Sequence, residues 1–245
     1  MIILILLFPF LAFSSIEGNV GFYSDFIWRG TTFSEHRPAV QGVLDGDLGK
    51  NFFLSGFFSN AEFSDPGMHE NSQVTSEMDI TLSKSWVTDN WEVQGYYSRF
   101  FFPNAGVFDS DEWNLQGKYL GYSLELSLMD DYFGYHSRYT YVRLGKEWEY
   151  WKSFEGAFYV GHNSFDRPKG SIRTRDGNET LDGAGNPDYI DVFFLNRKIL
   201  ENKSCVEVGV NWTNREEYSV DQGVISKNDG KDFVVVVSYI LPFSL

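Results

Sequence analysis

Three scarcities limit what this sequence can encode. The chain has one cysteine, Cys205, which cannot form an internal disulfide and is most simply interpreted as a packed strand residue. Lysine and arginine number 20 against 34 acidic residues, and the net charge of -14 disfavours a nucleic-acid partner, because a polyanion is bound by basic residues that replace its counterions. After the first residues, no apolar run reaches the roughly 18 residues that a membrane-spanning helix needs.

The chain starts with an apolar segment of the length typical of an export signal. Residues 2–13 are apolar, and Ala12 and Ser14 fit the small-x-small rule for cleavage, although no Lys or Arg precedes the segment. We therefore expect a signal peptide over residues 1–14 and a single barrel domain over residues 15–245. An exported chain without a spanning helix can enter a membrane only by closing a β-barrel, which pairs every backbone group.

Aromatic residues are abundant, at 18% of the chain, and apolar and polar residues alternate at period two in several stretches. Both features are typical of strands. Over residues 75–87, Met78, Ile80 and Leu82 alternate with Glu77 and Asp79. Residues 112–120, 122–129 and 205–213 repeat this scheme of one apolar and one polar face. With the polar face inward, such strands predict a membrane barrel with a polar lumen.

The fold class that follows is all-β, a single antiparallel transmembrane β-barrel of about 12 strands, with about 10 or 14 as alternatives. The expected strands cover residues 18–30, 38–48, 51–63, 75–87, 91–102, 112–120, 122–129, 138–148, 154–163, 189–196, 205–213 and 232–243. The first of these is expected to place Phe22, Phe26 and Trp28 on its apolar face, with Asp25 and Arg29 on the other.

The connections between these strands alternate in length. The longer polar ones follow odd strands, as at residues 31–37, 64–74 and 164–188, and the short ones follow even strands, as at residues 49–50 and 88–90. Outer-membrane barrels have short periplasmic turns and longer outer loops, so this parity predicts the outer membrane of a Gram-negative bacterium. Tryptophans near strand ends would form girdles at the membrane interfaces: Trp28, Trp86, Trp91, Trp113 and Trp212.

The stretch from Asn19 to Asp45 also resembles the TorF family of porins from Gram-negative bacteria. The matching residues are Asn19, Val20, Ser24, Asp25, Phe26, Arg29, Gly30, Ser34, Pro38, Ala39, Gln41, Gly42 and Asp45, and Ser59, Asn60, Glu77 and Asp79 fit as well. The resemblance covers about the first third of the chain. It implies an outer-membrane barrel with a porin role and supplies no catalytic or ligand residues. The final strand departs from the common barrel ending, because Ser244 and Leu245 follow Phe243.

If the faces are assigned correctly, the lumen is acidic. The predicted pore-lining residues are Asp25, Arg29, Asp45, Glu77, Asp79, Lys118, Glu125 and Glu207, with Glu112, Asp191 and Arg143 among further lumen residues. We expect Arg29 and Asp25 to join a lumen network with Glu77 or Asp79. An acidic wall concentrates cations, so the sequence predicts weak cation preference. The alternative is that these groups only fill a closed barrel with ion pairs.

The sequence offers little for catalysis or metal binding. His162, Asn163 and Ser164 have the residue types of an outer-membrane phospholipase, but neighbouring strand residues point to opposite faces and cannot form a triad. His36, His69 and His136 fall in separate connections, and the glycine-rich loop at residues 164–188 lacks the glycine and glutamate positions of a calcium loop. We expect no enzyme activity, no cofactor and no metal.

The function predicted is a porin-like channel for passive diffusion of small hydrophilic solutes or cations. A structural or scaffolding barrel with a plugged lumen is the first alternative, and a lipid-modifying enzyme is the second. Expected partners are outer-membrane lipid, lipopolysaccharide and the barrel-assembly machinery. The sequence leaves open the solute and whether barrels associate as homo-oligomers.

Overall fold

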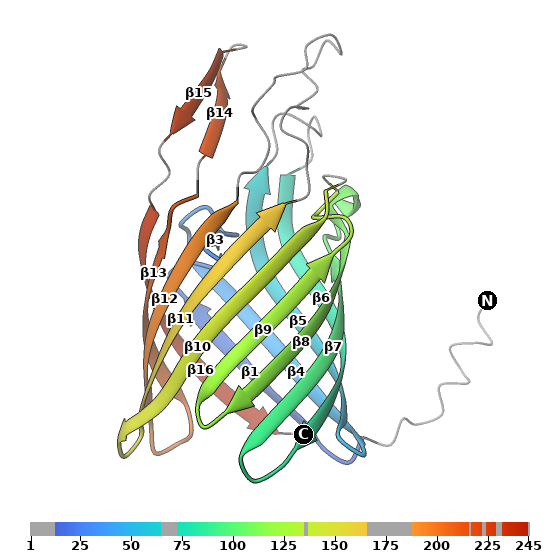
Figure 1. Ribbon diagram of the computed structural model, residues 1–245, viewed down its shortest axis with the longest axis vertical. Helices are drawn as coiled ribbons and strands as arrows, with labels where there is room; N and C mark the ends of the chain where they lie inside the picture. Colours follow the sequence, from blue (N-terminus) through green and yellow to red (C-terminus); the bar gives the residue numbers. More distant parts are fainter. Residues whose placement is uncertain are drawn as a thin grey trace, which may run out of the picture.

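The computed structural model describes residues 13–64, 73–134, 137–165, 188–215, 217–221, 224–228 and 232–244. These residues form a closed barrel in which every neighbouring pair of strands is antiparallel (Figure 1). Its twelve strands are β1 (Ile16–Tyr23), β4 (Ala39–Gly49), β5 (Phe52–Ser64), β6 (Gln73–Val87), β7 (Trp91–Phe101), β8 (Ser110–Tyr119), β9 (Tyr122–Met129), β10 (Tyr139–Trp151), β11 (Phe154–Phe165), β12 (Tyr189–Ile199), β13 (Cys205–Thr213) and β16 (Asp232–Ser244). The prediction of a twelve-stranded antiparallel barrel is confirmed.

The barrel is apolar outside and polar inside. On β6, Met78 and Ile80 are 47% and 53% exposed, whereas Glu77, whose side chain points to the other face of the strand, is 1% exposed. On β9, Leu124, Leu126 and Leu128 are exposed, and Ser123, Glu125 and Ser127 are buried. Water does not solvate such a leucine face well, whereas lipid does, so this distribution is that of a membrane barrel.

The two ends of the barrel differ in their connections, as Figure 1 shows. At one end, the turn end, two to five residues join β4 to β5, β6 to β7, β8 to β9, β10 to β11 and β12 to β13. Lys50 and Asn51 adopt φ values of 54° and 61°, as in the two-residue turns that match strand twist. The other end, the loop end, carries the longer connections, including the hairpin of β14 (Glu217–Asp221) and β15 (Val224–Asn228) and the 3-10 helix η1 (Gly106–Phe108).

The first strand is shorter than predicted. Instead of reaching residue 30, β1 stops at Tyr23, and the chain forms the small hairpin β2 (Ile27–Trp28) and β3 (Thr31–Thr32) before β4 begins. The period-two pattern misled here because Phe26 is buried in an interior aromatic cluster instead of lying on the outer face. The chain between β1 and β4 therefore folds into the lumen around Phe26 and Trp28 instead of extending the wall.

Several predictions from the sequence fall outside the described residues. They concern most of the signal peptide at residues 1–12, His69 and His136, and residues 166–187 of the glycine-rich loop. Within the described residues, no helix has the length and apolar character required to cross a membrane.

Candidate functional site

The segment at residues 24–38, here called the inward segment, is shaped by its own polar residues. The Asp25 carboxylate accepts hydrogen bonds from the hydroxyls of Thr32 (2.7 Å) and Ser34 (2.8 Å), and it lies 2.8 Å from His36 Nδ1. The Ser34 hydroxyl in turn accepts a bond from the Phe26 backbone N–H. These bonds close the segment into a compact loop, so Asp25 acts as an organiser of this loop.

Aromatic side chains anchor the inward segment at the loop end. Trp28 lies within 5.3 to 6.3 Å, between ring centroids, of Phe33, Phe100, Tyr132, Phe133 and Tyr139. We call this group, together with Phe26 and Phe102, the aromatic cluster. Rings at these separations attract each other beyond the effect of area burial alone. Part of the interior at the loop end is therefore dry and packed, and the Trp28 ring lies inside the barrel and cannot belong to an interfacial girdle.

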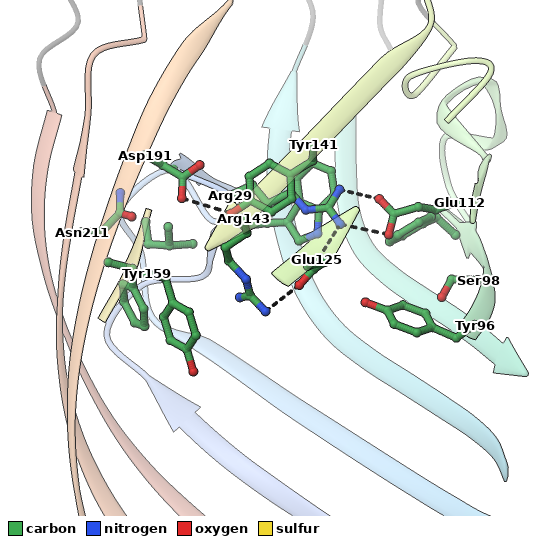
Figure 2. Close-up of a pocket in the computed structure, with 15 residues that line it drawn as sticks. Arg29, Tyr96, Ser98, Glu112, Glu125, Tyr141, Arg143, Tyr159, Asp191 and Asn211 are labelled. Carbon is green, nitrogen blue, oxygen red and sulfur yellow. Dashed lines mark hydrogen bonds and ion pairs between the residues drawn. The ribbon is translucent and has the colours of Figure 1, made fainter. Parts of the chain in front are cut away.

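Beyond the aromatic cluster, Arg29 fixes the tip of the inward segment to the wall. Its guanidinium pairs with both oxygens of Glu112 and lies 3.3 Å from Glu125 Oε1 (Figure 2). It donates a hydrogen bond to the Ser127 hydroxyl at 2.7 Å. It also lies 4.4 Å from the centroid of the Tyr141 ring. An arginine fork that is 8% exposed and paired with two carboxylates is a strong, directional contact.

This contact crosses the barrel. Glu112 lies on β8 and Glu125 on β9, and β9 is six strands from β1 in either direction around the sheet. The inward segment starts at β1 and returns to β4, so Arg29 reaches the diametrically opposite wall. The segment therefore spans the lumen from one wall to the other.

The remaining space beside Arg29 is a cavity of about 410 Å³, the central cavity. Its lining combines the inward segment with β7 to β13 and includes Tyr96, Tyr141, Arg143, Tyr159, Asp191, Phe193 and Asn211. Arg143 Nη2 lies 2.5 Å from Glu125 Oε2, so Glu125 accepts from two arginines at once. Asp191 accepts from the Tyr141 hydroxyl at 3.2 Å and from Asn163 at 2.8 Å.

Two further cavities lie within the barrel. A side cavity of about 130 Å³ is bordered by Asp25 and Glu207, and a turn-end cavity of about 470 Å³ is bordered by Lys118, Glu147, Glu155 and Arg197. Tyr159 borders both the turn-end cavity and the central cavity, so these two spaces share a wall residue. Polar interior spaces of this size hold water.

The predicted pore-lining residues do not share one site. Arg29 and Glu125 meet at the central cavity, whereas Asp25 and Glu207 border the side cavity and Lys118 borders the turn-end cavity. Lys118 pairs with Glu147 at 3.3 Å, and Glu207 accepts from Arg197 and from Ser238. Asp45 accepts a hydrogen bond from Ser55.

Glu77 and Asp79 border none of these three cavities. In the described part of the chain, Glu77 Oε2 and Asp79 Oδ1 are buried without a hydrogen-bond partner. The expected network of Asp25 and Arg29 with these two residues is wrong, because Arg29 binds Glu112 and Glu125 on the far wall. The pattern on one strand could not show that the strand stops at Tyr23 and that the chain then crosses the lumen.

Sequence reasoning missed the aromatic part of the central cavity. Tyr96, Tyr141, Tyr159 and Phe193 line it, although aromatic residues were expected on the lipid side. A signal was available in the strand register: Tyr159 pairs with Gly145, and Phe193 lies over Gly209 of the neighbouring strand. A glycine beside an inward aromatic position leaves room for the ring against the wall.

The residues considered for catalysis do not assemble. Asn163 is fully buried and bonded to Asp191 and Tyr139, whereas the next residue, Ser164, donates to Asp188 at the surface. His162 is on the exposed face of β11. Among the described residues, no group of three or more His, Cys, Asp or Glu side chains is arranged to hold a metal ion.

Comparison with known proteins adds a family match over part of the chain and a likeness of fold. Residues 12–96 match the model of a family described as a bacterial protein of unknown function (Gcw_chp). Comparison with curated proteins gives no match.

Among solved structures, the chain is similar to the KdgM porin, with 9% identity, coverage of 94% of this chain and 99% of that chain, and a TM-score of 0.50. It also aligns with the COG4313 outer membrane channel from Pseudomonas putida F1, with 12% identity, coverage of 94% and 95%, and a TM-score of 0.49. The likeness to the KdgM porin shows that this chain has the fold of an outer-membrane porin.

Proposed function

We propose that this protein is a porin-like channel of the Gram-negative outer membrane, of the TorF type, that lets small hydrophilic solutes diffuse passively. The observation that carries the proposal is the polar interior, with a central cavity of about 410 Å³ and a turn-end cavity of about 470 Å³ inside an apolar outer surface. A barrel that served only as a membrane anchor would need no hydrated space of this kind. The porin fold and the resemblance of residues 19–45 to TorF porins support the proposal.

The path we propose runs between the inward segment and the wall formed by β10 to β13. Solute enters at the loop end, passes the central cavity beside Arg29, and leaves through the turn-end cavity. We place the narrow point of this path at Arg29, Glu112 and Glu125, which their ion pairs hold in position. Fixed charges at a narrow point act on a passing ion with little screening by salt.

Weak cation preference is part of the proposal. In the central cavity, carboxylates outnumber basic groups. Its lining includes two arginines, Arg29 and Arg143, and three carboxylates, those of Glu112, Glu125 and Asp191. The net field along the path is therefore negative, and cations are enriched.

Planar-bilayer recording of the refolded protein in a potassium chloride gradient tests this function. We expect steady conductance and a reversal potential displaced towards the potassium equilibrium potential. A displacement towards the chloride potential would overturn the cation preference. A protein that is folded and inserted but carries no current would overturn the channel itself.

One observation favours a second candidate, a structural barrel with a plugged lumen. The aromatic cluster fills part of the interior at the loop end, and Phe33 and Phe102 within it are buried. If the cluster seals the whole cross-section, the cavities below it are closed water pockets. The same bilayer recording separates the two functions, because a plugged barrel carries no current until the inward segment is removed.

The partners we propose follow from the outer surface. The exposed apolar side chains of β6, β8 and β9 would contact lipid and, at the loop end, lipopolysaccharide. Insertion would require the barrel-assembly machinery, which receives the last strand, β16.

A further inference from the structure

Polar groups converge on the central cavity from both of its walls. Asn211 is 2% exposed, and its amide nitrogen is buried without a hydrogen-bond partner in the described residues, as is Arg143 Nε. Figure 2 shows the Tyr96 hydroxyl pointing into the space from the opposite side, on β7. A buried donor without an acceptor costs free energy, so these groups gain from an occupant that supplies one.

The charges of the cavity argue for an uncharged occupant. Two arginines face three carboxylates, a formal balance of about -1 if each group is ionised as usual. Arg29 is already engaged by Glu112 and Glu125, and Arg143 by Glu125. An anion would therefore meet Asp191 and Glu125, and carboxylates already neutralise both guanidinium groups. A cation would be attracted only by the one carboxylate in excess.

The groups that remain suit hydroxyls. An amide and a phenol both donate and accept, as a hydroxyl does, and the Asp191 carboxylate has further lone pairs for hydroxyl donors. A neutral compound with several hydroxyl groups would pair with all of these groups at once. The cavity volume lies within the range of about 300 to 1,000 Å³ that is typical of small-molecule sites.

An aromatic ring adds a flat surface to this polar set. A Cβ at Gly209 would come within 2.9 Å of the Phe193 ring, so the ring lies against the wall because β13 has a glycine there. Phe193 lines the central cavity and is paired in register with Asn211. The ring and the unpartnered amide therefore occupy adjacent positions, which suits a ring compound with an apolar C–H face and hydroxyl edges.

We propose that the central cavity is a binding site for a neutral sugar ring in transit, with Phe193 as the stacking surface and Asn211, Arg143, Tyr96 and Asp191 as hydrogen-bond partners. This rests on the proposed channel function and names its solute class. It differs from simple diffusion because occupancy of the site saturates.

Glucose is the probe, and binding is measured in two independent ways. In planar bilayers, glucose is expected to reduce the ion current along a saturable curve. In detergent, it is expected to change tryptophan fluorescence with the same midpoint, since Trp28 lines the cavity. Sorbitol, which has hydroxyls but no ring, and glucuronate, which adds a carboxylate to the ring, should each bind at least about tenfold weaker, because a lost ring contact or a buried like charge costs that much.

Two pairs of variants separate the site from the rest of the wall. Phe193→Ala and Asn211→Leu should weaken glucose binding at least about tenfold, a change of about 1.4 kcal/mol, without abolishing conductance. Phe194→Ala and Asn196→Leu change neighbouring outward-facing positions on β12 and should leave binding unchanged.

Each failure has its own signature. A conducting protein with no saturable response to glucose, or one that binds glucuronate more tightly, overturns the sugar site and leaves the channel. A protein that carries no current but shows the fluorescence titration overturns the channel and leaves the binding site. Equal weakening by the outward-facing variants would show that the effect reflects barrel distortion, which also overturns the assignment.

Discussion

The loop-end and turn-end halves of the lumen are built differently, although the same strands run through both. At the loop end, the inward segment packs through aromatic rings and the buried arginine contacts of Arg29. At the turn end, Lys118 and Glu147 pair at 3.3 Å with more than a third of each side chain exposed. The first arrangement fixes positions and the second leaves a hydrated vestibule. We infer that discrimination between solutes is made at the loop-end half and that the turn-end half is permissive.

Removing the inward segment should give the largest effect. Replacing residues 25–37 with a short Gly-Ser loop takes away the part of the chain that crosses the lumen, while β1 and β4 keep their register. We expect single-channel conductance to rise severalfold and cation preference to fall, because the fixed narrow point is lost. Heat-modifiable migration on a gel checks that the barrel still closes. An unchanged conductance would mean that the inward segment does not limit the current.

Arg29→Met should be the next most disruptive change. It leaves Glu112 buried without its guanidinium partner and Glu125 with Arg143 alone, and breaking a buried pair costs about 3 to 5 kcal/mol. Urea unfolding in detergent measures the loss. Arg37→Met is the matched control on the same segment, since its pairs with Glu35 and Glu62 are exposed and should contribute about 0 to 1 kcal/mol. Similar losses for the two variants would contradict the assignment of Arg29 as the main anchor.

A charge comparison between the two halves should give a smaller, selective effect. Asp191→Asn removes a carboxylate that lines the central cavity, whereas Glu147→Gln removes one that Lys118 already offsets. We expect the reversal potential in a salt gradient to move towards zero clearly for Asp191→Asn and little for Glu147→Gln. The opposite ranking would place the selective region at the turn end.

Lys118→Met should have the smallest effect. Its ion pair with Glu147 is open to water and is worth less than about 1 kcal/mol. Stability in urea and single-channel conductance should both stay close to those of the wild-type protein. A marked loss of either would show that the turn-end half is as constrained as the loop-end half.

The wall of the barrel was predictable from the sequence, and the inward segment was not. Strands such as β6 and β9 carry strict alternation because lipid and lumen each impose a residue type, and that constraint is local. The position of residues 24–38 depends on partners far along the chain, such as Arg29 with Glu112 and Trp28 with Phe133. The period-two pattern predicted that Phe26 and Trp28 face lipid. An aromatic cluster inside the barrel gives the same alternation of apolar and polar residues, so the pattern could not distinguish the two positions.

The sugar site shows the same limit. Asp191 and Arg143 were expected in the lumen from charge alone, but Phe193 and Asn211 become informative only when the register places Gly209 beside the ring. Only three-dimensional pairing, not residue type, distinguishes an aromatic side chain facing lipid from one that serves as a stacking surface.

The crossing by Arg29 also constrains how the barrel can assemble. The inward segment is made early in the chain, but its partners on β8 and β9 come some 80 to 100 residues later, and the ring of strands is sealed only when β16 pairs with β1. Contacts this distant in sequence form slowly. Arg29 must therefore enter the forming lumen before β16 pairs with β1, or it must enter the closed barrel afterwards through the loop end. Refolding of Arg29→Met should distinguish the two routes, since only the first would slow seam closure when the early anchor is missing.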